Sequence, residues 1–275
     1  MFNAIVLSGG GIKGFGTLGG IQYLLDNNLL SDLKYYSGTS IGSIICYFLA
    51  IGYTPIEMII YIISNKVFDI PDANIDSFIK GEGIYNFSIF TKHFEQMTLD
   101  KLNYIPTLKE LYEKLGKILY TCTFNITSKK KEYISYHTHP DMLCIDAIRL
   151  SASLPFIFND CIYKEEYFID GGFVDNCPFL PITLLNENEN LNIVIFNLKN
   201  ENKDEYYKMI DKFYTIIMIP MNELLELQLK YIKENCTIIN LEMESIKLYH
   251  FHITHSKKLE LFSVGYNLTK SIIIK

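Results

Sequence analysis

Three short glycine-rich stretches constrain this chain most, because each follows an apolar run that suits a buried strand. They read Gly9-Gly10-Gly11-Ile12-Lys13-Gly14, Gly38-Thr39-Ser40-Ile41-Gly42 and Asp170-Gly171-Gly172. Small residues at the ends of strands let loops turn sharply and let the backbone approach a ligand. The pattern predicts an α/β fold in which the loops at strand ends carry the chemistry.

The middle stretch has the G-x-S-x-G spacing of a nucleophile elbow, a strained turn between a strand and a helix. Gly38 and Gly42 flank Ser40 where a side chain would collide with the turn. The apolar run Ile41–Ala50 predicts a helix that begins directly after the serine, and its dipole favours negative charge there. Ser40 is the predicted nucleophile, while this pentapeptide alone leaves an ordinary glycine-rich turn open.

The first stretch lies between a predicted strand, Phe2–Leu7, and a helix with apolar periodicity. Consecutive glycines expose backbone N–H groups at a helix N-terminus, which suits either an oxyanion hole or a phosphate cradle. The spacing also fits a dinucleotide loop, but Gly38-Thr39-Ser40 stands where that fold needs an acidic residue. Phe15 replaces the lysine of a Walker A loop, which excludes that motif.

The third stretch places a carboxylate, Asp170, directly after the apolar run Tyr167–Ile169. Reactive groups gather at the carboxyl edge of open α/β sheets, so we expect Asp170 to meet Ser40 there. Asp-Gly-Gly is also common in loops, and a plain turn is the alternative.

Together the three stretches resemble the patatin-like phospholipases, serine acyl hydrolases that use a Ser-Asp dyad. The resemblance extends over nearly the whole chain, into Thr107–Thr123, Arg149–Phe158, Asn176-Cys177-Pro178 and Leu259–Ile272. It implies a single domain over residues 1–275. The implied fold is an α/β three-layer sandwich, with a mainly parallel central sheet and helices on both faces.

Residue by residue, the resemblance implies Ser40 as nucleophile, Asp170 as general base and the loop of Gly9, Gly10 and Gly11 as oxyanion hole. Supporting positions are Lys13, Gly14, Gly38, Gly42, Gly171 and Gly172. A solvated charge near a helix start is the alternative for Lys13. Ser8 and Ser43 depart from the family pattern, which often has an acidic residue and a third elbow glycine there.

The implied activity is hydrolysis of fatty-acyl esters of phospholipids, of phospholipase A type, through an acyl-Ser40 intermediate. The partner is a phospholipid or another acyl lipid, and no metal or cofactor is implied. An aspartate with an ordinary pKa of about 3.9 is a weak base, so the site must raise that pKa or stabilise the serine alkoxide.

Two other functions stay open. A Ser-Asp-His triad of the α/β-hydrolase kind would draw its histidine from His250, His252 or His255, although the first two suit the polar face of a strand. A lipid-binding or partner-binding protein without turnover would use the amphipathic run Asp204–Glu234. His137 and His139 have the spacing of metal ligands, but a polar strand edge or loop explains them better.

Net charge and cysteine content indicate which ligands and which cellular compartment suit this chain. A net charge of −6 argues against nucleic acid, and six cysteines without C-x-x-C pairs suit reduced thiols. Without a signal peptide, we expect a cytoplasmic protein.

Membrane contact is expected at the surface only. The apolar stretch Ile41–Ile63 is broken at Gly52, and Thr54–Glu57 has the pattern of a capped new helix, so no transmembrane helix is predicted. Peripheral contact would use apolar lips at Ile84-Tyr85, Phe87, Ile89-Phe90 and Phe156–Phe158, for which plain core is the alternative.

Overall fold

A computed structural model describes residues 1–30, 32–68, 83, 85–185, 191–200, 209–230, 232, 235–243 and 253–274. Across these ranges the strands form one eight-stranded sheet, in which hydrogen-bonded pairs connect β5-β6-β3-β2-β1-β7-β8 in turn and β4 pairs with β3 as well. The strands are β1 Ala4–Leu7, β2 Tyr35–Thr39, β3 Ile118–Asn125, β4 Lys130–Ile134, β5 Cys161–Tyr163, β6 Glu166–Asp170, β7 Ile193–Asn200 and β8 Cys236–Met243.

The sheet is mixed, with a parallel centre and an antiparallel end. Strands β3, β2, β1, β7 and β8 run parallel to one another, whereas β4 and β6 are antiparallel to β3 and β5 is antiparallel to β6. All four residues of β1 are buried, as expected for a central parallel strand covered on both faces. This arrangement confirms the predicted fold class.

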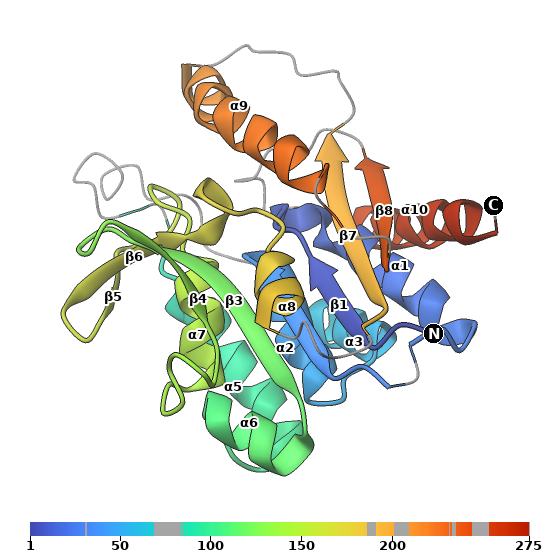
Figure 1. Cartoon of the computed structure of the whole chain (residues 1–275), viewed down its shortest axis with the longest axis horizontal. Coiled ribbons are helices and arrows are strands. Elements are labelled where there is room, and N and C mark those ends of the chain that lie inside the picture. Colours follow the sequence, from blue (N-terminus) through green and yellow to red (C-terminus); the bar gives the residue numbers. More distant parts are fainter. Residues whose placement is uncertain are drawn as a thin grey trace.

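Helices cover both faces of the sheet, as Figure 1 shows. They are α1 Gly14–Asp26, α2 Ile41–Ala50, α3 Pro55–Ser64, α5 Ser88–Leu102, α6 Leu108–Leu115, α7 Cys144–Ser151, α8 Leu180–Leu185, α9 Met209–Leu229 and α10 His255–Ile273, with short 3₁₀ helices η1 Gly11–Lys13 and η2 Gly171–Phe173. Alternate residues of β1 enter two separate cores. Ile5 and Leu7 face the larger core of α1, α2, α5 and α7, and Val6 faces the smaller core of α8 and α9.

Local sequence signals placed several of these elements correctly. The predicted helix over Ile41–Ala50 has those bounds in α2. In α3, Thr54 and Glu57 form the predicted capping box, because each side chain accepts a hydrogen bond from the other residue's backbone N–H. No single helix in the described ranges has the length and apolar composition of a membrane span, and α2 and α3, which pass that test only together, meet at a bend of 114°.

One edge of β3 brings two strand ends together. β2 runs parallel to β3 as far as the pair Thr39 with Cys122, and β6 runs antiparallel and ends at the pair Asp170 with Thr123. β4 overlaps β2 along β3 and therefore occupies the opposite edge. The carboxyl ends of β2 and β6 thus meet at adjacent residues of β3. Ser40 is the residue that directly follows the end of β2.

Candidate active site

Ser40 is held at a strained turn between β2 and α2. Its backbone has φ 54° and ψ −127°, a left-handed conformation that is rare outside glycine, and its side chain is buried. A Cβ added to Gly38 would lie 2.5 Å from the Gly42 carbonyl carbon, and one added to Gly42 would lie 2.3 Å from the Leu7 carbonyl oxygen. The steric demand for both flanking glycines is therefore as predicted from the spacing.

Two further serines fix the backbone of this turn. The Ser40 N–H donates to Ser151 Oγ at 3.1 Å, and the Ser151 hydroxyl donates to the Cys122 carbonyl of β3 at 2.6 Å. The Ser43 hydroxyl donates to the Ser40 carbonyl at 2.7 Å. Ser43 stands where the family pattern often has a glycine, and its hydroxyl adds a hydrogen bond that a glycine could not make. The role of Ser151 was missed, because only the fold shows what it contacts.

Asp170, at the end of β6, is almost completely buried. Its Oδ1 accepts a hydrogen bond from the Gly172 N–H at 2.7 Å, while Oδ2 has no partner of hydrogen-bond geometry among the described residues. Burial raises the pKa of Asp170 to about 6, and the Ser40 hydroxyl and the Gly172 N–H limit that rise by stabilising the charged form. The structure therefore brings the predicted nucleophile and the predicted base together.

The glycine loop lies against Ser40 and against Asn176. A Cβ on Gly9 would be 3.2 Å from Ser40 Cβ and 2.5 Å from Asn176 Oδ1. The Gly9 N–H donates to the Asn176 carbonyl at 3.0 Å, and Asn176 Nδ2 donates back to the Gly9 carbonyl at 3.3 Å. The amide of Gly9 is thus already engaged, which leaves Gly10 and Gly11 as the predicted oxyanion donors.

The supporting residues lie around this centre. Lys13 is only 5% exposed at the end of η1, so its alternative interpretation as a solvated charge is wrong. Gly14 packs against Ile41, the residue after Ser40. Gly171 lies against the Cys122 carbonyl, where a Cβ would come within 2.1 Å, so this turn requires glycine.

An apolar pocket of about 930 Å³, counted with its open mouth, leads away from Ser40. Ile41, Ile44, Ile45 and Phe48 line it, so it follows α2 for roughly two turns, or about 10 Å. Met58, Phe94 and Met97 from α3 and α5 line it as well.

The predicted apolar lips are mostly core. Phe87, Phe90, Ile157 and Phe158 are buried, and the three phenylalanine rings pack on one another, with the Phe87 and Phe158 centroids 5.0 Å apart. Tyr85 and Ile89 are half-buried, and Ile84 lies outside the described residues. Of this set in the described ranges, Phe156 alone is exposed, at 51%, and its φ is 66°.

The predicted histidines do not gather at this centre in the part of the chain that the structure describes. His250 and His252 lie outside it, and His255 is exposed at the start of α10. His137 and His139 lie in a turn, and the described residues contain no group of three metal-binding side chains. His93 lines the pocket and was missed, because a lone histidine on a helix gives no signal in sequence.

Comparison with known proteins assigns the family. The model of the patatin-like phospholipases matches residues 5–182, which include all three glycine-rich stretches. The chain belongs to the patatin-like phospholipase family. A probable lipid hydrolase, 463L of Invertebrate iridescent virus 6, is 34% identical over 211 residues, which are 74% of this chain and 68% of that protein. An uncharacterised protein of Acanthamoeba polyphaga mimivirus, R571, is 30% identical over 98% of this chain and 93% of its own length.

Solved structures share the patatin-like fold. VipD from Legionella pneumophila superposes with a TM-score of 0.63 at 18% identity, over 99% of this chain and 67% of that one. The type III effector ExoU superposes with a TM-score of 0.52 at 14% identity, and this chain spans 53% of its length. At these identities the likeness concerns the fold alone.

The burial of Asp170 predicts a stability difference that depends on pH. Its pKa is about 6 when folded and 3.8 ordinarily, so the charged carboxylate costs folding about 3 kcal/mol above pH 6 and nothing below pH 4. Asp170→Asn keeps an oxygen acceptor for the Gly172 N–H and removes the charge. We expect the variant to resist urea better than the wild type at pH 8, with the advantage lost on acidification through pH 6 to 4.

The exposed residue Asp141 supplies the control for this experiment, because Asp141→Asn makes the same chemical change on the surface. The urea midpoint of Asp141→Asn should equal that of the wild type at pH 8 and at pH 4. A destabilised Asp170→Asn at pH 8 would contradict the proposed cost of burial.

Proposed function

We propose that this protein hydrolyses fatty-acyl ester bonds of phospholipids or related acyl lipids, in a phospholipase A type of reaction. The observation that carries the proposal is the placement of the Ser40 hydroxyl beside the buried Asp170 carboxylate, at the start of an apolar pocket. The family itself, and the viral relative described as a probable lipid hydrolase, support a lipid ester hydrolase.

In the proposed mechanism, the Ser40 hydroxyl, the Asp170 carboxylate and the backbone N–H groups of the glycine loop carry out the ester hydrolysis. Asp170 takes the proton of Ser40, and a pKa near 6 makes it a better base than an ordinary aspartate while it stays charged at neutral pH. Ser40 attacks the ester carbonyl, and the backbone N–H groups of Gly10 and Gly11, with the N-terminus of α2, stabilise the oxyanion. As the tetrahedral intermediate collapses, Asp170 returns the proton to the oxygen of the departing alcohol, and acyl-Ser40 remains. The regenerated carboxylate then activates a water molecule that hydrolyses acyl-Ser40 and releases the fatty acid.

The apolar pocket suits the acyl chain rather than the polar headgroup. Burial of methylene groups stabilises the complex by about 0.8 kcal/mol each, so a long chain contributes much of the binding. A lipid in a bilayer must be reached at the membrane surface, and we include peripheral membrane contact in the proposal. Phe156 supports this contact, because it is exposed between Leu154 and Phe158, which both line the pocket.

Three observations weigh against the other functions. The Ser40 hydroxyl lies beside Asp170 with no histidine from the described residues at this centre, which weakens a triad. A binding protein without turnover has no use for a serine held in a strained conformation. α9 packs partly against the smaller core, through Leu225, which is what a covering helix does.

Removal of the serine hydroxyl tests the function directly. We expect Ser40→Ala to lose fatty-acid release from mixed phospholipid vesicles by about 10³-fold or more, since the acyl-enzyme cannot form. Ser271→Ala, on the exposed face of α10, makes the same change far along the chain and should keep full activity. Release by Ser40→Ala at the wild-type rate, or no release of any fatty acid by the wild type, would refute the proposal.

The pH profile tests the base. Because Asp170 must be charged to accept the proton, kcat/KM should fall about tenfold per pH unit below pH 6. The measurement uses a soluble ester, so that vesicle properties do not change with pH. A profile that stays flat down to pH 4 would show that no group with a raised pKa acts as base.

A bulky side chain in the pocket should change the preferred chain length. Ile44 is half-buried and lines the pocket, so Ile44→Trp should lower kcat/KM for a palmitoyl ester at least tenfold while a butyryl ester keeps most of its rate. Ile60→Trp provides the matched control, because Ile60 is 57% exposed on α3 and is absent from the pocket lining. Equal losses on both esters would contradict an acyl pocket.

A further inference from the structure

Asp175 and Asn176, which follow η2, contact all three segments of the proposed site. The Asp175 N–H donates to the Gly171 carbonyl at 2.9 Å, beside the proposed base. The Thr39 hydroxyl, from the residue before Ser40, donates to the Asp175 carbonyl at 2.8 Å. The Gly9 N–H donates to the Asn176 carbonyl at 3.0 Å. Two adjacent residues therefore join the elbow, the base and the glycine loop.

The side chain of Asp175 is anchored to β4. It is 3% exposed, its Oδ2 accepts a hydrogen bond from the Tyr133 hydroxyl, and Lys131 Nζ lies 3.5 Å from the same oxygen. Burial and the Asp175 carboxylate raise the pKa of Tyr133, so its hydroxyl stays protonated and donates. Lys131 also covers the Tyr133 ring, with Nζ 4.9 Å from the ring centroid.

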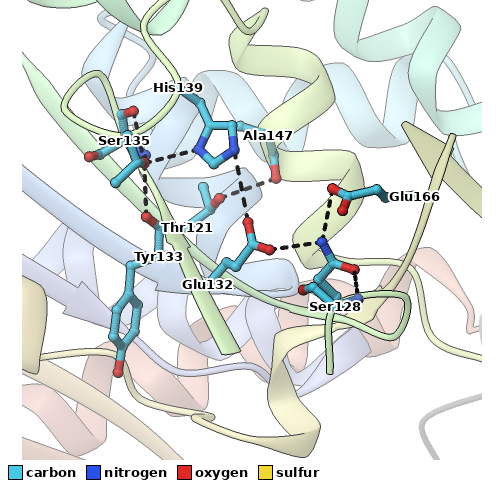
Figure 2. A network of polar contacts seen from close by, with 10 residues as sticks. Thr121, Ser128, Glu132, Tyr133, Ser135, His139, Ala147 and Glu166 are labelled. Atoms are coloured by element: carbon cyan, nitrogen blue, oxygen red, sulfur yellow. Dashed lines mark hydrogen bonds and ion pairs between the residues drawn. The ribbon is translucent and has the colours of Figure 1, made fainter. Parts of the chain in front are cut away.

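The alternation of β4 separates this anchor from a second polar network. Lys131 and Tyr133 face Asp175, whereas Glu132 faces the other side, near His139 and Asn125. Figure 2 shows the Tyr133 ring directed away from the network of Glu132 and His139. In the register of the sheet Tyr133 pairs with Cys122, whose carbonyl holds Ser151 and, through it, the Ser40 N–H. The anchor therefore rests on the part of β3 that also holds the elbow.

A buried carboxylate is costly unless it is paired, so its presence here calls for a reason. The backbone bonds of residue 175 do not need the carboxylate. Its side chain supplies the link that the backbone cannot, from the turn after Asp170 to the neighbouring strand β4. The backbone of this segment is bonded to β2, through Thr39 and Ser37, and to Gly9 of the glycine loop, so the bond to β4 comes from the Asp175 side chain.

We propose that Asp175, Tyr133 and Lys131 form a positioning cluster, the Asp175 clamp, which holds the Asp170 turn and the glycine loop in register with Ser40. This inference rests on the proposed function, because it concerns the alignment of the reacting groups. None of the three clamp residues lines the apolar pocket. A loosened clamp therefore changes the rate of the chemical step and leaves acyl binding intact.

The first variant removes one hydroxyl. Tyr133→Phe should lower kcat on a soluble ester about tenfold and leave KM within twofold of the wild type. The chain offers a matched control in Tyr167→Phe, because Tyr167, half-buried on β6, donates a comparable hydrogen bond to Asp160 that is exposed to solvent. That variant should keep wild-type kcat. A parallel rise of KM in Tyr133→Phe, or the same loss in Tyr167→Phe, would overturn the clamp.

Lys131 provides a variant that does not depend on a buried hydroxyl. Its side chain is about one third exposed, so substitution there is tolerated by the fold. Lys131→Gln should lower kcat, and Lys131→Arg, which keeps the charge, should restore it. A fall in both variants, or in neither, would contradict an ionic anchor. In the double variant with Tyr133→Phe, the loss should be smaller than the product of the two single losses, because both act through Asp175.

Amide hydrogen exchange separates the clamp from the proposed function. Exchange in the peptides that cover residues 171–177 and 9–14 should become faster in Tyr133→Phe and stay unchanged in Tyr167→Phe. This readout needs no substrate. If the wild type hydrolysed no ester, the proposed function would fail. The exchange rates alone would then show whether the Asp175 clamp holds residues 171–177 and 9–14 in place. Unchanged exchange together with unchanged kcat in an active enzyme would overturn the clamp alone.

Discussion

The site depends on one geometric constraint, the meeting of β2 and β6 on a single edge of β3. Backbone hydrogen bonds fix the register of both strands there, so Thr39 and Asp170 lie beside the adjacent residues Cys122 and Thr123. No flexible loop intervenes between either strand end and the residue that it presents. Separations of about 130 residues in sequence thus become neighbouring positions in space, and the precision comes from the sheet rather than from side-chain packing.

Burial raises the pKa of Asp170, and it also makes the charged carboxylate unfavourable for folding. The same loss of water that raises its pKa disfavours the charged form, and only the Gly172 amide and the Ser40 hydroxyl offset that cost. The strained backbone of Ser40 adds a second unfavourable contribution. Both groups are tolerated because the strands and glycine contacts around them leave little room to relax, as is common at functional sites.

What the sequence could predict was local. The requirement for glycine at position 38, the bounds of α2 and the cap at Thr54 all follow from contacts within a few residues, whereas Gly42 was predicted from the G-x-S-x-G spacing although its Cβ would strike the distant Leu7 carbonyl. The antiparallel direction of β6, the bond from Ser40 to Ser151 and the anchoring of Asp175 arise between distant segments, where one sequence carries no periodic signal. For the aromatic residues considered as lips, the sequence left core and rim both open, because hydrophobicity does not distinguish them, and burial assigns most of these residues to the core.

The proposed reacting groups and the far wall of the apolar pocket come from separate parts of the chain. The reacting groups belong to the ends of β1, β2 and β6, whereas the far wall of the pocket comes from α3 and α5, between residues 58 and 97. That wall can be replaced in evolution as one contiguous piece without disturbing the strands that align the dyad. The lining of the proposed acyl pocket can therefore vary within residues 58–97 while the strand ends that carry Ser40 and Asp170 stay unchanged.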